Sequence, residues 1–229
     1  MALQQGTVLV TGGTRGIGRA TCAALGADHH VLVGGRDREL AEEVASSLPS
    51  AEPWICDLTD AADLQRAVTE VRELDVVIHS AGMEAMGTIV ESTAEQWRDA
   101  FELNVVSVVE LTKALLPQLR ARRGMVLAVN SGSGLTSRAG AGAYCASKFA
   151  LTAFTDALRE EEAGRVRVVS VHPGRVDTEM QERIVERQGG QYRAEEYLRP
   201  EDVASVIASA VRLPRGATVG TVVVRPDSV

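Results

Sequence analysis

Short apolar runs alternate with longer amphipathic stretches along nearly the whole chain. The short runs are rich in valine and predict strands at residues 7–11, 30–34, 54–56, 75–79, 125–130, 166–171 and 218–224. The longer stretches predict helices at residues 16–27, 38–48, 60–72, 93–122, 142–162 and 200–213. Asp60 is a candidate N-cap of the third helix. Pro117 is expected to bend or interrupt the fourth helix near its end.

This alternation predicts an α/β fold, a Rossmann-type doubly wound parallel sheet flanked by helices. The chain has 229 residues and shows no internal repeat or linker, so residues 1–229 are expected to form a single domain. Ligands of such sheets bind beyond the carboxyl ends of the strands. The residues after Thr11, His79, Asn130 and Val171 should therefore meet at one edge of the sheet.

Composition narrows the functional classes. The formal net charge of −7 argues against nucleic-acid binding, because phosphate recognition usually needs a basic surface. No apolar run approaches membrane-spanning length and no targeting leader is recognisable, so we expect a soluble cytoplasmic protein without a membrane partner. The cysteines and histidines lack the spacing of a metal site, and no metal is predicted. His172 is expected to pack or form hydrogen bonds rather than to act in catalysis.

A glycine-rich turn follows the first predicted strand. Gly12, Gly16 and Gly18 lie between that strand and the first helix. Glycine lets the backbone approach a pyrophosphate closely, and the helix N-terminus presents free N–H groups to its charge. The strand–turn–helix context favours a dinucleotide site, although the glycines alone would also suit a tight turn without a ligand.

The end of the second strand indicates which dinucleotide binds. A carboxylate there would bind the ribose 2′-hydroxyl of NAD, whereas an arginine accommodates the 2′-phosphate of NADP. The strand ends in glycine followed by Arg36, and Arg15 of the glycine turn could reach the same phosphate. NADP (NADPH) is therefore favoured over NAD, with Asp37 as the residue that a shifted turn would aim at the ribose instead. Asp57 either accepts a hydrogen bond from the adenine amino group or forms a turn.

Tyr144 and Lys148 are four residues apart in a predicted helix and therefore share a face. A free phenol has a pKa near 10, and a neighbouring ammonium is expected to lower that pKa toward the pH at which general acid–base catalysis is effective. Ser131, directly after the fifth strand, could polarise a carbonyl or hold an alcohol oxygen. The tyrosine and lysine alone would also suit an ordinary helix surface; the serine and the upstream glycine turn favour catalysis.

In these motifs and their order the chain resembles the short-chain dehydrogenase/reductase family over nearly its full length. Residues 11–18 match the family's Thr-Gly-x3-Gly-x-Gly, residues 144–148 its Tyr-x3-Lys, and residues 173–178 its Pro-Gly-x3-Thr segment. The resemblance implies an NADP(H)-dependent oxidoreductase that interconverts a small-molecule carbonyl and a secondary alcohol by hydride transfer. Tyr144 would be its general acid/base.

The resemblance also assigns roles to further residues. The implied catalytic set is Asn104, Ser131, Tyr144 and Lys148, in which Asn104 would hold a proton-relay water. The implied cofactor-binding set is Gly12, Thr14, Arg15, Gly16, Ile17, Gly18, Arg36, Asp57, Leu58, Ser80, Ala81, Gly82, Tyr144, Lys148, Pro173, Gly174, Val176 and Thr178. Ser80 departs from the family's usual asparagine. The C-terminus lacks the Asp-Gly-Gly of many tetrameric members, so a homodimer is expected in preference to a homotetramer.

The sequence does not identify the substrate. Residues 178–199 are expected to form a charged lid over it. Met83, Met86, Leu135 and Met180 could form an apolar wall, whereas Arg138, Arg175 and Arg183 could meet an anionic substrate. The alternatives are therefore a dehydrogenase of a hydroxy acid or of an amino-acid side-chain alcohol, and a non-catalytic nucleotide-binding regulator.

Overall fold

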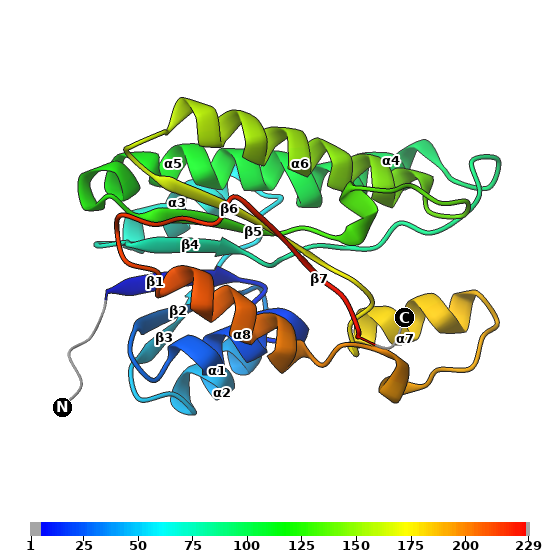
Figure 1. Cartoon of the computed structure of the whole chain (residues 1–229), viewed down its shortest axis with the longest axis horizontal. Helices are drawn as coiled ribbons and strands as arrows, with labels where there is room; N and C mark the ends of the chain where they lie inside the picture. The colour runs from blue at the N-terminus through cyan, green and yellow to red at the C-terminus, as the bar shows by residue number, and fades with distance from the viewer. Residues whose placement is uncertain (1–5, 228–229) are drawn as a thin grey trace.

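A computed structural model of the chain describes residues 6–227 and contains one parallel sheet within them. The strand order is β3-β2-β1-β4-β5-β6-β7, and every neighbouring pair is parallel (Figure 1). The strands are β1 (Thr7–Thr11), β2 (His30–Gly35), β3 (Ala51–Ile55), β4 (Val76–His79), β5 (Met125–Val129), β6 (Arg167–Pro173) and β7 (Thr221–Val224). The strand order reverses between β1 and β4, where ligands of doubly wound sheets bind.

Helices cover both faces of the sheet (Figure 1). The helices are α1 (Gly16–Leu25), α2 (Arg38–Ser46), α3 (Ala61–Glu70), α4 (Ala94–Phe101), α5 (Ser107–Arg122), α6 (Gly142–Glu161), α7 (Glu179–Arg187) and α8 (Pro200–Val211). Helices α1, α2 and α8 bury apolar side chains on one face, and α3, α5 and α6 do so on the other. The predicted fold class is therefore confirmed. No helix in the described part of the chain is both long and apolar enough to cross a membrane.

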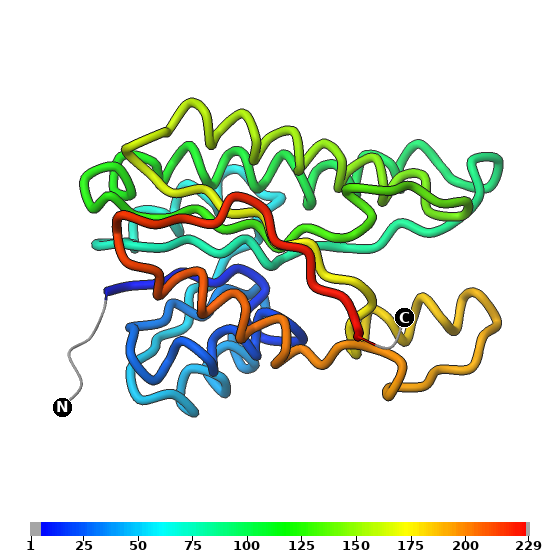
Figure 2. Tube along the Cα trace, viewed as in Figure 1, coloured from blue at the N-terminus to red at the C-terminus, as the bar shows by residue number. Residues whose placement is uncertain are grey.

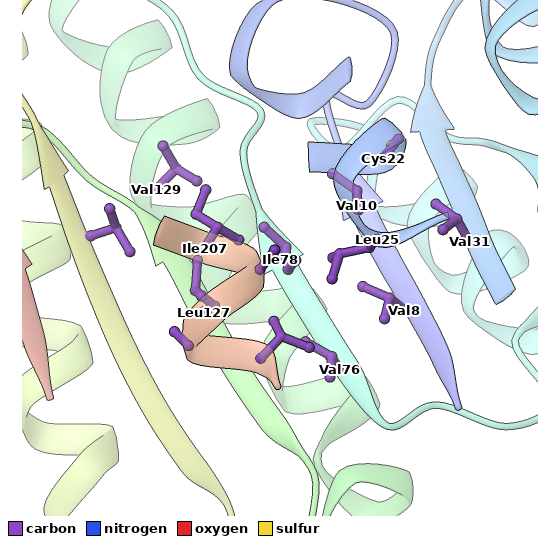
Figure 3. Close-up of a cluster of buried hydrophobic side chains, with 14 of the residues drawn as sticks. Val8, Val10, Cys22, Leu25, Val31, Val76, Ile78, Leu127, Val129 and Ile207 are labelled. Atoms are coloured by element: carbon purple, nitrogen blue, oxygen red, sulfur yellow. The ribbon is translucent and has the colours of Figure 1, made fainter. Parts of the chain in front are cut away.

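The apolar core between the sheet and helices α1, α2 and α8 supports the glycine turn. Val10 of β1 and Ile78 of β4 are fully buried there, and Ile207 of α8 packs against them from outside the sheet (Figure 3). Cys22 of α1 belongs to the same cluster, and its sulfur would lie 3.0 Å from a Cβ added at Gly13. Aliphatic burial of this kind contributes roughly 25 cal/mol per Å², so it fixes α1 relative to the two central strands.

Two predicted elements differ in the structure. The third strand spans Ala51–Ile55 rather than residues 54–56, so it includes Pro53. Proline is tolerated there because β3 lies at the edge of the sheet, paired with β2 on one side among the strands of residues 6–227. The segment from 179 to 187, for which no helix was predicted within the expected charged lid, is the helix α7, capped by the side chain of Thr178. Asp60 caps α3, as predicted.

The predicted helix at residues 93–122 is helical throughout but not uniform. A π-helical segment, Glu102–Val106, separates α4 from α5. Pro117 lies inside α5, which continues to Arg122, so the expected interruption is wrong. The flanking side chains Leu115 and Leu119 are fully buried against the sheet, and this tertiary packing outweighs the missing backbone hydrogen bond at the proline.

His79, at the end of β4, is a buried histidine whose pKa burial lowers to about 4. Its Nε2 lies 2.9 Å from Thr112 Oγ1 of α5. The unfolded chain takes up the proton near pH 6.5 and the folded chain only near pH 4, so the free energy of unfolding should fall as the pH drops through this window. We expect His79 to account for a loss of about 2 kcal/mol between pH 7 and pH 5, measured by urea unfolding.

The matched variant for this prediction is His79→Gln. Glutamine can keep a hydrogen bond to Thr112 but has no proton to gain over this range. His172 is also buried with a lowered pKa and remains in both proteins, so the difference between the two acid profiles isolates His79. Parallel profiles for the variant and the wild type would contradict the assignment.

Candidate active site

The glycine turn between β1 and α1 is built from close backbone contacts. Gly12 and Gly16 have φ values of +62° and +48°, in the left-handed region that glycine tolerates. A Cβ at Gly18 would lie 2.1 Å from the carbonyl oxygen of Gly12. Thr11 Oγ1 accepts hydrogen bonds from the backbone N–H groups of Ser80 and Ala81, both at 3.1 Å. The turn is therefore fixed to the end of β4 through Thr11, whatever side chain stands at position 80.

The N-terminus of α1 has the features of an anion site. Arg15 is its N-cap and supplies no side-chain acceptor, and the first turn contains no acidic residue. Helices α2, α3, α4 and α7 are instead capped by the side chains of Asp37, Asp60, Thr93 and Thr178. The first N–H groups of α1 thus have no capping side chain, and with the helix dipole they favour a negatively charged ligand.

A cavity of about 890 Å³ lies over this turn at the carboxyl edge of the sheet. The predicted cofactor residues that line it are Gly12, Thr14, Arg15, Gly16, Ile17, Gly18, Arg36, Asp57, Leu58, Ser80, Ala81, Gly82, Tyr144, Lys148 and Thr178. Asn104, Ser131, Pro173, Gly174 and Val176 are not among its lining residues. Met83, Leu103, Asn130 and Met180 line the cavity although no cofactor role was predicted for them. Asn130 directly follows β5, so its position at a strand end was a usable signal.

The two acidic residues near the end of β2 both have structural partners. Asp37 Oδ1 accepts a hydrogen bond from Leu40 N at 3.2 Å, so this carboxylate caps α2. Asp57 Oδ1 accepts from the backbone N and the hydroxyl of Thr59, which hold the pKa of Asp57 below its usual value. Asp57 therefore forms a turn, which was one of the two roles predicted for it from the sequence. Its other oxygen lies 3.8 Å from Arg36 Nη1.

Tyr144 and Lys148 both line the cavity from α6. The Lys148 ammonium is buried, lies 5.9 Å from the centre of the Tyr144 ring and donates to the carbonyl of Val129 at 3.2 Å. Burial lowers the pKa of Lys148 to about 8. Burial also raises the pKa of Tyr144, and hydrogen bonding to Ser131 and the charge of Arg138 only partly oppose this.

The direction of the tyrosine shift corrects the sequence-based expectation. The spacing of Tyr144 and Lys148 predicted a lowered phenol pKa, but desolvation of the ring is the largest effect on it. The ammonium is directed at the Val129 carbonyl. In the protein alone the phenol is therefore held in its protonated form at neutral pH.

Asn104 lies in the π-helical segment and is almost fully buried. Its Oδ1 accepts from Met83 N at 2.9 Å, and its Nδ2 donates to Met83 O and to Ser147 Oγ, both at 3.0 Å. Ser147 Oγ donates in turn to the carbonyl of Tyr144 at 2.8 Å. Asn104 thus joins the loop after β4 to the helix that carries the tyrosine.

His172 forms the hydrogen bonds expected of a structural histidine. Its Nδ1 lies 2.9 Å from the carbonyl oxygen of Ser131, and its Nε2 lies 2.8 Å from Ser170 Oγ. The ring is fully buried, and burial lowers its pKa. It therefore fixes the backbone of the serine next to Tyr144. Within residues 6–227 no group of three or more His, Cys, Asp and Glu side chains is arranged to hold a metal ion.

Residues 178–199, which were predicted to form a lid, leave the body of the molecule after β6 and return at the start of α8 (Figure 2). A bridge between Val176 and Leu198 closes their two ends. Two ion pairs join α7 to the rest of the chain, one to the glycine turn and one to the loop after β4. Glu179 Oε2 lies 2.9 Å from Arg15 Nη1 of the glycine turn, and Arg183 Nε lies 3.2 Å from Glu84 Oε1 in the loop after β4.

Comparisons with known proteins agree with this architecture. Residues 6–189 match the family model described as short chain dehydrogenase. The chain is 30% identical over 242 residues to an NADP-dependent 3-hydroxy acid dehydrogenase of Schizosaccharomyces pombe, covering 96% of this chain and 92% of that protein. It is 31% identical to dehydrogenase/reductase SDR family member 11 of Mus musculus, covering 95% and 93%. A solved closed form of serine dehydrogenase complexed with NADP+ superposes with a TM-score of 0.88 at 26% identity, covering 97% and 96%.

The close contact at Gly18 predicts a strong effect of one added methyl group. Gly18→Ala should cost about 1–3 kcal/mol of folding free energy because the new Cβ would overlap the Gly12 carbonyl. It should also weaken NADPH binding at least about tenfold, since the turn must shift. Thermal unfolding and fluorescence titration measure the two effects. Gly216→Ala is the control, because a Cβ there would meet nothing within 4 Å; equal effects of the two variants would refute the argument.

Proposed function

Because the chain belongs to the short-chain dehydrogenase/reductase family, we propose that it is an NADP(H)-dependent oxidoreductase that interconverts a carbonyl and a secondary alcohol. The observation that carries the proposal is a single cavity shared by an uncapped helix N-terminus and the Tyr144–Lys148 face of α6. The first feature suits a pyrophosphate and the second suits proton transfer. A purely regulatory nucleotide-binding protein would need only the first.

The residues of the chain fit a nicotinamide dinucleotide. The glycine turn leaves space where side chains would stand, and the N–H groups of α1 would hold the pyrophosphate. The bound cofactor supplies or accepts the hydride. Tyr144 gives a proton to the substrate oxygen or takes it back, and Ser131 holds that oxygen by hydrogen bonding. Lys148 would bind the nicotinamide ribose.

The pKa directions concern which form of Tyr144 each reaction direction needs. Burial raises the pKa of Tyr144, so the phenol keeps the proton that a general acid must deliver. Oxidation of an alcohol needs the phenolate instead. The Lys148 ammonium lies on the same helix face and would stabilise the phenolate by its positive charge. Because the pKa of Lys148 is about 8, the ammonium form that provides this stabilisation is lost at higher pH.

The preference for NADP(H) rests on charge at the end of β2. Arg36 is largely exposed at the rim of the cavity, and Asp37, the acid that could have bound a ribose hydroxyl, caps α2 instead. Arg15 lines the same cavity. The similarity to an NADP-dependent 3-hydroxy acid dehydrogenase and to a serine dehydrogenase solved with NADP+ supports the same cofactor.

A hydroxy acid, including an amino-acid side-chain alcohol, is the second candidate substrate. The names of these two relatives support it. Two arginines of the chain could pair with a carboxylate near Tyr144. Arg138 acts electrostatically on the tyrosine and donates to Ser133 Oγ at 3.2 Å, and Arg183 lines the cavity from the lid. Comparing hydroxy acids with uncharged alcohols in the same assay separates this candidate from a general carbonyl reductase.

We also propose a homodimer formed through α5 and its neighbour α6. Val106, just before α5, and Phe149 of α6 are large apolar side chains with 41% and 43% exposure. The two helices run side by side on one face of the sheet (Figure 1). A second copy packed on this face would bury both side chains, which favours association.

Replacement of the phenol hydroxyl tests the catalytic proposal. Tyr144→Phe should lower kcat for carbonyl reduction by about 10²-fold or more, with little change in NADPH affinity, because only the transferable proton is lost. NADPH absorbance with a panel of ketones and hydroxy acids measures the rate. Tyr197→Phe, which removes the hydroxyl of another buried tyrosine outside the cavity lining, is the control. Retention of most of the rate by Tyr144→Phe would remove this tyrosine as the acid.

Binding of the two cofactors tests the NADP(H) assignment. NADPH should bind about tenfold more tightly than NADH, because charge-assisted hydrogen bonds to the 2′-phosphate have no counterpart in NADH. Arg36→Ala should reduce this ratio, whereas Arg38→Ala, which removes a cation paired with Glu42 on α2, should preserve it. Fluorescence titration gives all dissociation constants. Equal or tighter binding of NADH by the wild type would reject the assignment.

A further inference from the structure

The ion pair between Arg15 and Glu179 links the predicted phosphate site to the lid. We propose that Glu179 competes with the cofactor's 2′-phosphate for Arg15 and so limits the preference of the protein for NADP(H) over NAD(H). The inference rests on the proposed function, since it concerns the same cofactor. It makes Glu179, a residue outside the family motifs quoted above, a determinant of cofactor specificity.

Arg15 is positioned so that its side chain could reach either Glu179 or the cofactor's 2′-phosphate. Its neighbour Thr14 packs against the end of β2, where a Cβ at Gly35 would lie 2.8 Å from Thr14 Cγ2. Its other neighbour, Gly16, faces the start of the lid, and a Cβ there would lie 3.2 Å from Thr178 Cγ2. Arg15 therefore stands between Gly35–Arg36 on one side and Thr178–Glu179 on the other. Its flexible side chain lines the cavity, as do Arg36 and Glu179.

The strength of the ion pair makes exchange feasible. The side chains of Arg15 and Glu179 are 60% and 58% exposed, and exposed pairs of this kind contribute only about 0.2–1 kcal/mol. A 2′-phosphate carries more charge than a carboxylate and is a stronger partner for a guanidinium. The Glu179 carboxylate would remain near the phosphate after the exchange and repel it. Glu179 thus opposes NADP(H) both as a competitor and as a like charge.

The second ion pair on α7 keeps the lid attached while Arg15 changes partners. Arg183 lies four residues after Glu179 and therefore on the same face of the helix. Its partner Glu84 has a side chain only 8% exposed, although Arg183 itself is 48% exposed; with one partner buried, this pair is screened less than the Arg15–Glu179 pair and is the less exchangeable of the two. Loss of the Arg15–Glu179 contact would therefore change the charge around the phosphate without releasing α7.

Glu179 is a better residue to substitute in a test than Asp57, the acid paired with Arg36. Asp57 also holds a turn through two hydrogen bonds to Thr59, so replacing it would disturb the backbone. The only side-chain partner recorded for Glu179 in the described residues is Arg15. Glu179→Gln therefore removes the charge and leaves the local fold in place.

The experiment compares the dissociation constants of NADPH and NADH by fluorescence titration at low ionic strength. Glu179→Gln should tighten NADPH binding up to about fivefold and leave NADH binding unchanged. The gain should shrink as salt is added, because exposed charges are screened. Glu182→Gln is the matched control: it removes the same charge from an exposed position on the same helix that has no recorded ion pair. Glu179→Lys should shift the ratio further in the same direction.

A double variant links the effect to Arg15. In the Arg15→Ala background, Glu179→Gln should bring a smaller gain in NADPH affinity, because the competition for Arg15 is lost and only the repulsion between Glu179 and the phosphate remains. An unchanged NADPH/NADH ratio in Glu179→Gln, an equal change for both cofactors, or the same change in Glu182→Gln would overturn the inference. The ratio of NADPH to NADH affinity in the wild type tests the proposed cofactor. The change of this ratio on substitution of Glu179 tests the competition, so failure of one proposal can be distinguished from failure of the other.

Discussion

The carboxyl edge of the sheet depends on the close approach of two backbone segments, the turn after β1 and the residues after β4. A Cβ at Gly12 would lie 2.9 Å from both N and Cα of Ala81, so the two segments meet with no room for a side chain. Thr11 Oγ1 joins them by accepting two backbone hydrogen bonds and donating a third to Ile78 O at 3.4 Å. The cavity floor and the N-terminus of α1 are positioned by this contact.

Much of this arrangement was predictable because it is encoded locally. Strand ends follow from valine-rich runs, and the residues after parallel strands must share an edge. The glycine turn and the pair Tyr144 and Lys148 are defined by spacing alone. Elements set by distant contacts were predicted less well. Pro53 lies in an edge strand, and Pro117 lies in a helix held by a buried face, so in both cases tertiary position decided the outcome.

At the site, too, local patterns were predictable from the sequence and distant contacts were not. The motifs predict which residue types belong to the site, but the partners of these residues come from other parts of the chain. Asn104 contacts Met83 and Ser147 from within a π-helical segment, and a helical periodicity of 3.6 does not indicate such a segment. The raised pKa of Tyr144 likewise depends on burial, which spacing does not report. Glu84 and Glu179 pair with Arg183 and Arg15 across long sequence separations.

The bridge between Val176 and Leu198 gives the segment between them a further property. Because its two ends meet at this bridge, the segment leaves and rejoins the body of the molecule at one place and lies outside the seven strands of the sheet. The entropy of closing a loop rises only slowly with its length. Segments of different size and charge could therefore be grafted between these two residues while the strands and the glycine turn stay as they are. For protein engineering, this segment is the place at which changes of length and charge would disturb the sheet least.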